Sequence, residues 1–478
     1  MTELTTLSAR DLLGKLKTKE VSSEEVMRAC LARIEAENPR VNAIVALRDA
    51  DQLIQEARAQ DQARETGDTP AGALQGLPVA IKDTANAAGL PGTLGSPILK
   101  NFIPKADDLH VARMRAAGII VIGKTNVPEF GLGSHSVNPV YGASCNPYDT
   151  GRSIGGSSGG AAAALATGMQ WLLDGSDMMG SLRNPAGWGN VYGFRPSYGL
   201  VPNDPGKELF LSPMATAGPM ARCPDDLALL LDVQAGRDPG VPFSHGDGPF
   251  SGALNADLTG RRIGWLGDWG GAWPMEDGVL ATCEAALKTF EDLGCTVEPL
   301  AAPFPAEDLW QSWIDLRSLA VAGSVGPLFD NPKYRPLIRE DAVWEIERGR
   351  ALSASEILRA SSIRSAWYRA AAALFARYDA LIAPTAQVWP FPVDWAHPKV
   401  IAGQAMDTYH RWMECVIPAS LIGLPGLAVP AGFGAGGLPM GLQLIGPYRG
   451  DLGVLQLAQG YHLATDWPSR RPPPRAGG

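Results

Sequence analysis

NPYDTGRSIGGSSGGAAAALATGMQWLLDGSDMMGSLRNPA, residues 146–186, is poor in charge and rich in glycine and serine. A Gly-Gly-Ser-Ser-Gly-Gly run (155–160) precedes a small apolar segment, 161–169, which predicts a buried helix. The amides and hydroxyls of this run would lie at a helix N-terminus, a favourable place for anions and oxyanions. Ser181 follows a glycine, so a tight turn can present its hydroxyl beside backbone N–H groups. An acyl nucleophile with an oxyanion hole requires that arrangement.

The flanking sequence alternates predicted strands and helices. LPVAIKD (77–83) has the pattern of a short buried strand, DDLHVARMRAAG (107–118) that of an amphipathic helix, and IIVIGK (119–124) that of a β-branched parallel strand. Further strands are predicted in RRIGWLG, TVEPL, DALIAPT, GLAVPAG and GLPMGLQLIG. Helices between such strands indicate an α/β fold with right-handed crossovers.

Composition narrows the class of protein. The chain has 478 residues, a net charge of −9 and no basic block, so we expect no nucleic-acid or membrane partner. Six scattered cysteines without a C-x-x-C pair predict reduced thiols, a cytoplasmic protein and no metal site. The N-terminus lacks the pattern of a signal peptide, and no apolar run reaches the ~18 residues of a membrane span.

Two motif matches are weaker than they look. Residues 118–125 fit the P-loop pattern, yet the residues between the glycines are β-branched and predict a strand end rather than a phosphate-binding loop. Residues 155–159 fit G-x-S-x-G, but a nucleophile elbow should follow a buried strand, and NPYDTGRSI cannot be one. We therefore expect neither an NTPase nor an α/β-hydrolase triad.

Lys82 is the one cation in the predicted strand 77–83. A lysine at a strand end often reaches the surface, and only a neutral amine can act as a base. Burial would have to lower the Lys82 pKa by ~3 units from ~10.4 for base catalysis near pH 7.

Four ordered motifs together resemble the amidase signature hydrolases. They are GLPVAIKD (76–83), GKTNVPEF (123–130), GGSSGG (155–160) and DMMGSLRNPA (177–186). The resemblance is dense from about 70 to 200 and returns at 423–446. It implies an α/β fold with one large domain, in which a central, twisted, mixed and mostly parallel sheet is covered by helices on both faces.

The resemblance also implies a mechanism. Ser181 resembles the nucleophile, Ser157 the bridging serine on a cis peptide bond, and Lys82 the base. Lys82 would take a proton from Ser157, which takes one from Ser181 as it attacks the carbonyl carbon. The oxyanion hole would be formed by the backbone N–H groups of Met178, Met179, Gly180 and Ser181. No cofactor and no metal is expected. Asp177 and Arg183 match family positions, and we expect them to support the loop.

Met179 departs from the family pattern, which usually has Gly-Gly before the nucleophile. A methionine disfavours positive φ and brings a flexible apolar side chain near the reacting carbonyl. Met178 and Met179 are therefore predicted to bind substrate and to favour apolar amides.

The resemblance leaves two functions open. The first is a stand-alone serine hydrolase of aryl or alkyl amides, extending to carbamates and esters, with only a small-molecule partner and a monomeric or homodimeric state. The alternative is the glutaminase subunit of a tRNA-dependent amidotransferase.

The domain organisation follows from the same patterns. One domain is expected over residues 1–478, without repeats or a low-complexity linker. Within it we expect N-terminal helices (1–65), the signature core (70–235), a variable and mostly helical region (240–400), and C-terminal strands with a helix (420–465).

Overall fold

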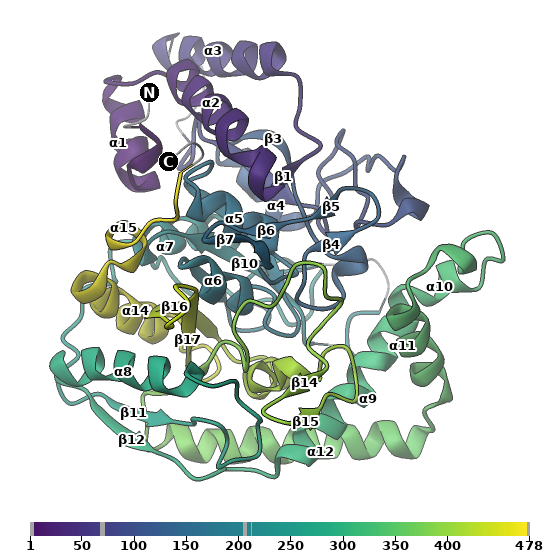
Figure 1. Cartoon of the computed structure of the whole chain (residues 1–478). Helices are drawn as coiled ribbons and strands as arrows, with labels where there is room; N and C mark the ends of the chain where they lie inside the picture. Colours follow the sequence, from purple (N-terminus) through teal and green to yellow (C-terminus); the bar gives the residue numbers. More distant parts are fainter. Residues whose placement is uncertain (1–3, 67–71, 204–207, 212, 476–478) are drawn as a thin grey trace.

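Two β-sheets occupy the centre of the computed structural model, which describes residues 4–66, 72–203, 208–211 and 213–475 (Figure 1). In the larger sheet the spatial order is β12 (Thr296–Pro299), β11 (Arg262–Trp265), β13 (Ala380–Pro384), β17 (Pro439–Ile445), β16 (Gly426–Phe433), β9 (Tyr192–Arg195), β10 (Thr216–Ala221) and β8 (Leu172–Asp177). The smaller sheet has the order β1 (Ile44–Val45), β3 (Ile120–Thr125) and β2 (Pro78–Lys82). Three short hairpins are added by β4 (Val137–Asn138) with β5 (Gly142–Ala143), β6 (Cys145–Asn146) with β7 (Asp149–Ser153), and β14 (Val400–Ile401) with β15 (Gln404–Ala405).

Helices surround both sheets. The α-helices are α1 (Ala9–Thr18), α2 (Ser23–Val41), α3 (Ala50–Thr66), α4 (Leu109–Ala116), α5 (Gly159–Ala166), α6 (Arg183–Gly189), α7 (Pro224–Gln234), α8 (Val279–Asp292), α9 (Ala306–Ser324), α10 (Gly326–Phe329), α11 (Glu340–Ala351), α12 (Ala354–Phe375), α13 (Ile417–Leu421), α14 (Asp451–Thr465) and α15 (Trp467–Arg470). Short 3₁₀ turns are η1 (Leu4–Thr6), η2 (Pro97–Leu99), η3 (Glu129–Gly131), η4 (Arg335–Leu337) and η5 (Arg411–Val416).

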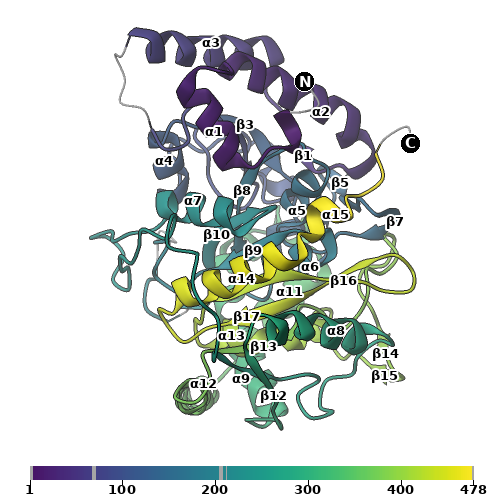
Figure 2. The same cartoon turned by 90° about the vertical axis from the view of Figure 1, so that its left-hand side faces the viewer.

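The helices form layers on both faces of the larger sheet, as expected. Helices α8 and α14 pack against β16 and β17 on the face toward the viewer in Figure 2. Helix α6 packs against the same two strands from the opposite face (Figures 1 and 2). At one end of the molecule α2 and α3 pack against the smaller sheet and α1 packs against α7, while α9, α11 and α12 lie toward the other end (Figure 1). The fold is thus a single large α/β domain.

The expectation of a mostly parallel sheet is wrong. Among the described residues of the larger sheet, β11 pairs in parallel with β12 and β13, while the other five neighbouring pairs are antiparallel. The physical reason is visible between β16 and β17, which are joined by residues 434–438 alone. A connection that short can close a hairpin but cannot make the crossover that parallel strands need.

The structure also tests the two motif matches, the P-loop pattern and the G-x-S-x-G pattern. Residues 120–125 form the buried strand β3, which confirms that the P-loop match is a strand end. Strand β7 precedes the Gly-Ser run, but it is mostly exposed and pairs with β6 and, at Arg152, with Pro392, so it is not the buried strand of a nucleophile elbow. Residues 1–3 of the predicted N-terminal helical segment, and 70–71, 204–207 and 212 of the predicted signature core, lie outside the described residues. The remaining segment boundaries stay predictions.

One continuous hydrophobic core joins the two sheets to their helices. Trp188 of α6 stacks on Trp412 of η5 with ring centroids 5.5 Å apart. A smaller cluster, which includes Leu132, Val321 and Ile346, lies beneath α9 and α11. Within the described ranges, no helix is both long and apolar enough to cross a membrane.

Helix α6 approaches β17 so closely that the contact depends on glycine. A Cβ on Gly441 would lie 2.6 Å from the Gly187 Cα, whereas a Cβ on Gly436, in the adjoining hairpin loop, would meet nothing within 4 Å. We predict that Gly441→Ala lowers the free energy of unfolding by about 1–3 kcal/mol through overpacking. Urea denaturation should detect this change, and Gly436→Ala is the matched control with little effect. Equal stability of the two variants would show that α6 yields.

Candidate active site

Lys82 ends strand β2 and is almost completely buried, with 1% of its surface exposed. Its Nζ lies 2.8 Å from Ser157 Oγ and 2.8 Å from Ser158 Oγ. Ser176 supplies two more contacts, at 3.0 Å through Oγ and at 3.2 Å through its carbonyl oxygen. Burial lowers the Lys82 pKa to about 7, although the negative charges of Asp174 and Asp177 oppose this shift. An amine held among hydroxyls with a near-neutral pKa can accept and return a proton at pH 7.

Ser157 lies in the loop between β7 and α5, and the peptide bond that joins it to Gly156 is cis. Ser134 holds Gly156 through one hydroxyl: its Oγ donates to the Gly156 carbonyl oxygen (2.6 Å) and accepts from the Gly156 N–H (3.0 Å). The Ser158 N–H donates to the Ser181 carbonyl oxygen at 3.1 Å. This bond ties the Ser157 loop to the Ser181 loop.

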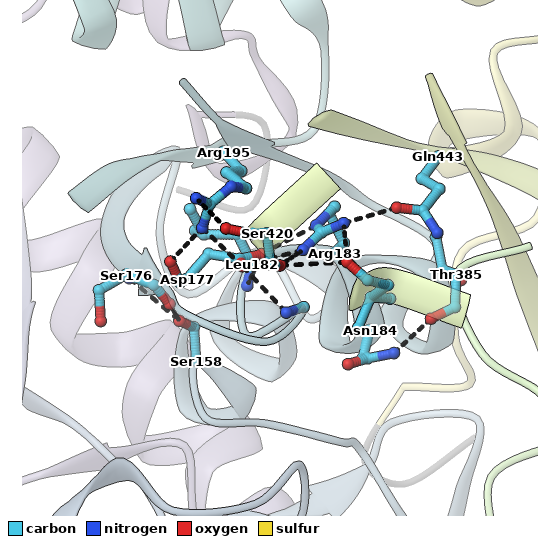
Figure 3. A network of polar contacts seen from close by, with 12 residues as sticks. Ser158, Ser176, Asp177, Leu182, Arg183, Asn184, Arg195, Thr385, Ser420 and Gln443 are labelled. Carbon is cyan, nitrogen blue, oxygen red and sulfur yellow. Dashed lines mark hydrogen bonds and ion pairs between the residues drawn. The ribbon is translucent and has the colours of Figure 1, made fainter. Parts of the chain in front are cut away.

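Ser181 lies in the turn between β8 and α6, and Asp177 organises that turn (Figure 3). The Asp177 carboxylate accepts hydrogen bonds from the N–H groups of Gly180 (2.9 Å) and Leu182 (3.1 Å). Gly180 has φ +78°, and a Cβ there would lie 2.5 Å from Asn184 Oδ1. The turn therefore needs glycine at position 180.

Two arginines neutralise Asp177 inside the protein (Figure 3). Arg183 approaches its carboxylate with Nε and Nη2, both at 3.0 Å, and Arg195 with Nη1 at 3.2 Å. Burial alone would raise the Asp177 pKa, but the two guanidinium charges outweigh it and hold this pKa well below the usual range. Arg183 also donates to Gln443 Oε1 and Ser420 Oγ, each at 2.6 Å. These contacts agree with a supporting role for Asp177 and Arg183.

The predicted oxyanion donors differ in availability. The Gly180 N–H is already donated to Asp177, so it is not free. Among the described residues, the N–H groups of Met178, Met179 and Ser181 make no hydrogen bond in this turn. Met179 is not among the residues with positive φ, so its replacement of the usual glycine does not strain the turn. A hole formed by Met178, Met179 and Ser181 remains the prediction.

Most amides of the Gly-Ser run already have hydrogen-bond partners. The Gly159 N–H donates to Ser136 Oγ at 3.2 Å and the Gly160 N–H to the Asn126 carbonyl oxygen at 3.1 Å. With the Ser158 N–H donated to Ser181, the amides that begin α5 already have partners. Within the described part of the run, Ser157 is the residue whose N–H has no partner, so the anion site there stays a prediction.

A cavity of about 530 Å³ brings the predicted residues together. Ser157, Ser181, Met178 and Met179 all line it, with Arg317 of α9. The rest of its lining is largely apolar and includes Phe130, Leu132, Tyr198, Leu209, Leu211, Leu319, Val321 and Val325. A larger groove of about 860 Å³ around Trp389 and Trp395 contains none of the predicted site residues.

Sequence reasoning missed the contribution of Ser158 and Ser176, which surround the Lys82 amine together with Ser157. Both lie inside the recognised motifs or directly beside them, next to Ser157 and Asp177. The motifs contain these serines, but a motif does not say which hydroxyl faces the lysine. Arg195 and Arg317 lie in none of the four motifs, so no sequence pattern singled them out. Within the described ranges, no three His, Cys, Asp or Glu side chains gather as a metal site would require.

Comparison with known proteins identifies the family of this chain. The family model described as Amidase matches residues 25–455. The chain belongs to the amidase signature family. A solved bacterial aryl acylamidase of the amidase signature enzymes superposes with a TM-score of 0.90 at 29% identity, covering 98% of this chain and 99% of that one. A peptide amidase in complex with chymostatin gives a TM-score of 0.79 at 28% identity, covering 98% and 99%.

Sequence relatives of this amidase-family chain carry a different name. A glutamyl-tRNA(Gln) amidotransferase subunit from Cyanothece sp. is 35% identical, with 97% of this chain and 99% of the relative covered. The protein of the same name from Ralstonia nicotianae is 34% identical, with 98% and 100% covered. The solved protein of that name from Thermotoga maritima gives a TM-score of 0.77 at 28% identity, covering 96% and 94%.

These relatives correct one expectation. We expected no nucleic-acid partner and a small molecule alone. The relatives, similar along nearly their whole length, are named as one subunit of an enzyme whose name includes a tRNA. That finding contradicts the expectation. Net charge was its basis, and the charge of one chain does not describe an assembly.

Ser157 and Ser158 allow a sharp test, because both hydroxyls lie 2.8 Å from the Lys82 amine but Ser157 alone of the two lines the cavity with Ser181. We predict that Ser157→Ala slows modification of Ser181 by a fluorophosphonate about 10²- to 10⁴-fold, since it breaks the proton path. Ser158→Ala is the control and should slow it far less. Equal losses in the two variants would contradict a path through Ser157.

Proposed function

We propose that this protein cleaves the C–N bond of a carboxamide through an acyl-enzyme on Ser181. The observation that carries the proposal is the buried Lys82 amine, 2.8 Å from a serine that shares a cavity with Ser181. A neutral amine in this position can serve as the base without histidine or metal. Hydrolase and amidase activity belong to the family, whereas the residue roles and the donor are our proposal.

The proposed chemistry runs in two stages. Lys82 accepts the Ser157 proton and Ser157 accepts the Ser181 proton, while Ser181 Oγ bonds to the carbonyl carbon and the C=O π electrons move to oxygen. The N–H groups of Met178, Met179 and Ser181 would stabilise that oxyanion. When the carbonyl re-forms, the C–N bond breaks and the nitrogen leaves with the proton returned through Ser157. Water then cleaves the acyl-enzyme by the same proton path.

The relatives favour glutamine as the donor. They support the alternative function, the glutaminase subunit of a tRNA-dependent amidotransferase, better than they support a stand-alone hydrolase of aryl or alkyl amides. In this function Ser181 would release ammonia from glutamine, and a partner subunit would use it on a tRNA-bound substrate. A cytoplasmic location remains a prediction from the cysteine pattern.

The cavity favours a second candidate donor, a neutral apolar amide. Arg317 is the one lysine or arginine among the described residues that line the cavity, but its Nε lies 2.7 Å from Glu345 Oε1 and its Nη2 lies 2.7 Å from Tyr409 Oη. Its Nη1 lies 3.6 Å from Met178 Sδ. The ion pair cancels the positive charge that a glutamine carboxylate would seek. Aryl or longer alkyl amides, carbamates and esters would instead gain about 0.8 kcal/mol for each buried CH₂.

A donor panel separates the two. The chain, purified alone, should be assayed with glutamine, an anilide, an aryl carbamate and an aryl ester, with Ser181→Ala as the blank. A glutaminase subunit should release ammonia from glutamine and do so faster with its partner present, whereas a stand-alone hydrolase should show the higher kcat/KM on the anilide. Turnover that persists in Ser181→Ala would overturn the nucleophile assignment for either donor.

The Lys82 pKa of about 7 predicts the pH dependence. Since the neutral amine is the active form, and its fraction rises with pH, kcat/KM should rise about tenfold per unit below pH 7 and level off above it. Lys82→Arg should lose about 10²- to 10⁴-fold at every pH, because arginine stays protonated. Stopped assays over pH 5–9 would check both. An arginine variant with near-normal turnover would rule out Lys82 as the base.

A further inference from the structure

The two sheets meet at a seam between their edge strands, β2 and β8. The strand pairings of the described residues include no backbone ladder there. Side chains take its place: Gln170, just before β8, accepts the Ala80 N–H through Oε1 at 3.2 Å, and Asp174 of β8 accepts the Lys82 N–H through Oδ1 at 2.9 Å. These N–H groups are two residues apart, so they point to the same edge of β2. Gln170 and Asp174 thus act as two rungs across the seam.

Asp174 is the rung next to the proposed chemistry. It is completely buried, and its second oxygen, Oδ2, lies 3.4 Å from His110 Nε2 on α4. Two residues further along β8, Ser176 contacts the Lys82 amine through its hydroxyl and its carbonyl oxygen. Asp174 therefore fixes the Lys82 backbone at the place where the Lys82 side chain meets the serine loops.

Asp174 also differs from the neighbouring aspartates in having no lysine or arginine partner among the described residues. Asp177, the other carboxylate that acts on Lys82, is neutralised by Arg183 and Arg195. On strand β3, which pairs with β2, Lys124 Nζ lies 3.8 Å from Asp83 Oδ1, so the charge of Asp83 is also paired. Among the described residues, Asp174 has no lysine or arginine nitrogen within 4.0 Å, and its ion-pair contact is His110.

We propose that Asp174 is a positioning residue for Lys82: it docks the lysine strand onto the serine strand, and its buried negative charge, which no lysine or arginine of the described residues pairs within 4.0 Å, acts on the Lys82 amine. His110 holds the second Asp174 oxygen in place. This inference rests on the proposed function, because it assigns Asp174 a task in the Lys82–Ser157–Ser181 path.

The test uses the pH dependence of Ser181 labelling by a fluorophosphonate, which needs no knowledge of the natural substrate. Asp174→Asn keeps an oxygen to accept the Lys82 N–H but removes the charge. Since that charge favours protonated Lys82, its removal should move the acidic limb of the labelling rate about one unit to lower pH. Asp174→Ala removes the hydrogen bond as well, so its labelling rate at the plateau should fall further, roughly tenfold or more below that of Asp174→Asn.

Gln170→Met is the matched control, because it removes the other rung of the seam without changing charge. It should leave the midpoint of the acidic limb where it is in the unaltered chain. A midpoint that stays unchanged or moves to higher pH in Asp174→Asn would overturn the proposal, as would an equal shift in Gln170→Met. If Asp174→Ala does not fold, the isosteric Asn variant decides. An unaltered chain that is never labelled at Ser181 would overturn the proposed function, and the positioning role with it.

Discussion

The Ser181 turn depends on the contacts of one buried carboxylate, that of Asp177. It accepts the N–H groups of Gly180 and Leu182 and meets Arg183 and Arg195, so one side chain fixes the turn that carries Ser181 and joins it to β9 and α6. A buried carboxylate is costly unless its partners are complete, and removing one partner of a buried ion pair typically costs about 3–5 kcal/mol. The Ser181 turn is therefore held by an all-or-none network rather than by ordinary loop packing.

Much of the site could be predicted from sequence, because its residues lie in short motifs of fixed order. Lys82, Ser157 and Ser181 are far apart in the chain, yet the structure gathers them around one amine and one cavity. The neighbours of that amine could not be predicted. Ser158 is adjacent to Ser157, and no periodicity tells which hydroxyl faces a lysine on another sheet. The contacts of Asp174 and Gln170 with β2 could not be predicted either. They are side-chain hydrogen bonds between two sheets, and no local sequence pattern specifies such bonds.

The strand directions were missed for a different physical reason. Apolar β-branched runs indicate burial on both faces, and burial is common to parallel and antiparallel strands in a large domain. Connection length would have been the better guide: the glycine-rich residues 434–436 between GLAVPAGF and GLPMGLQLIG have the composition of a hairpin. The expectation of no nucleic-acid partner was also wrong, because it rested on a net charge of −9, which is a property of one chain and not of an assembly.

The seam between β2 and β8 has a consequence for how activity arises during folding. Lys82 ends a strand of the smaller sheet and the Ser181 turn follows a strand of the larger one, so a chain in which either sheet has formed alone holds no complete Lys82–Ser157–Ser181 path. In the proposed mechanism, Ser181 becomes reactive only after the two sheets have docked in register. Covalent labelling of that serine would accordingly report tertiary assembly of the whole molecule. In a nascent or damaged chain the same hydroxyl would be unreactive.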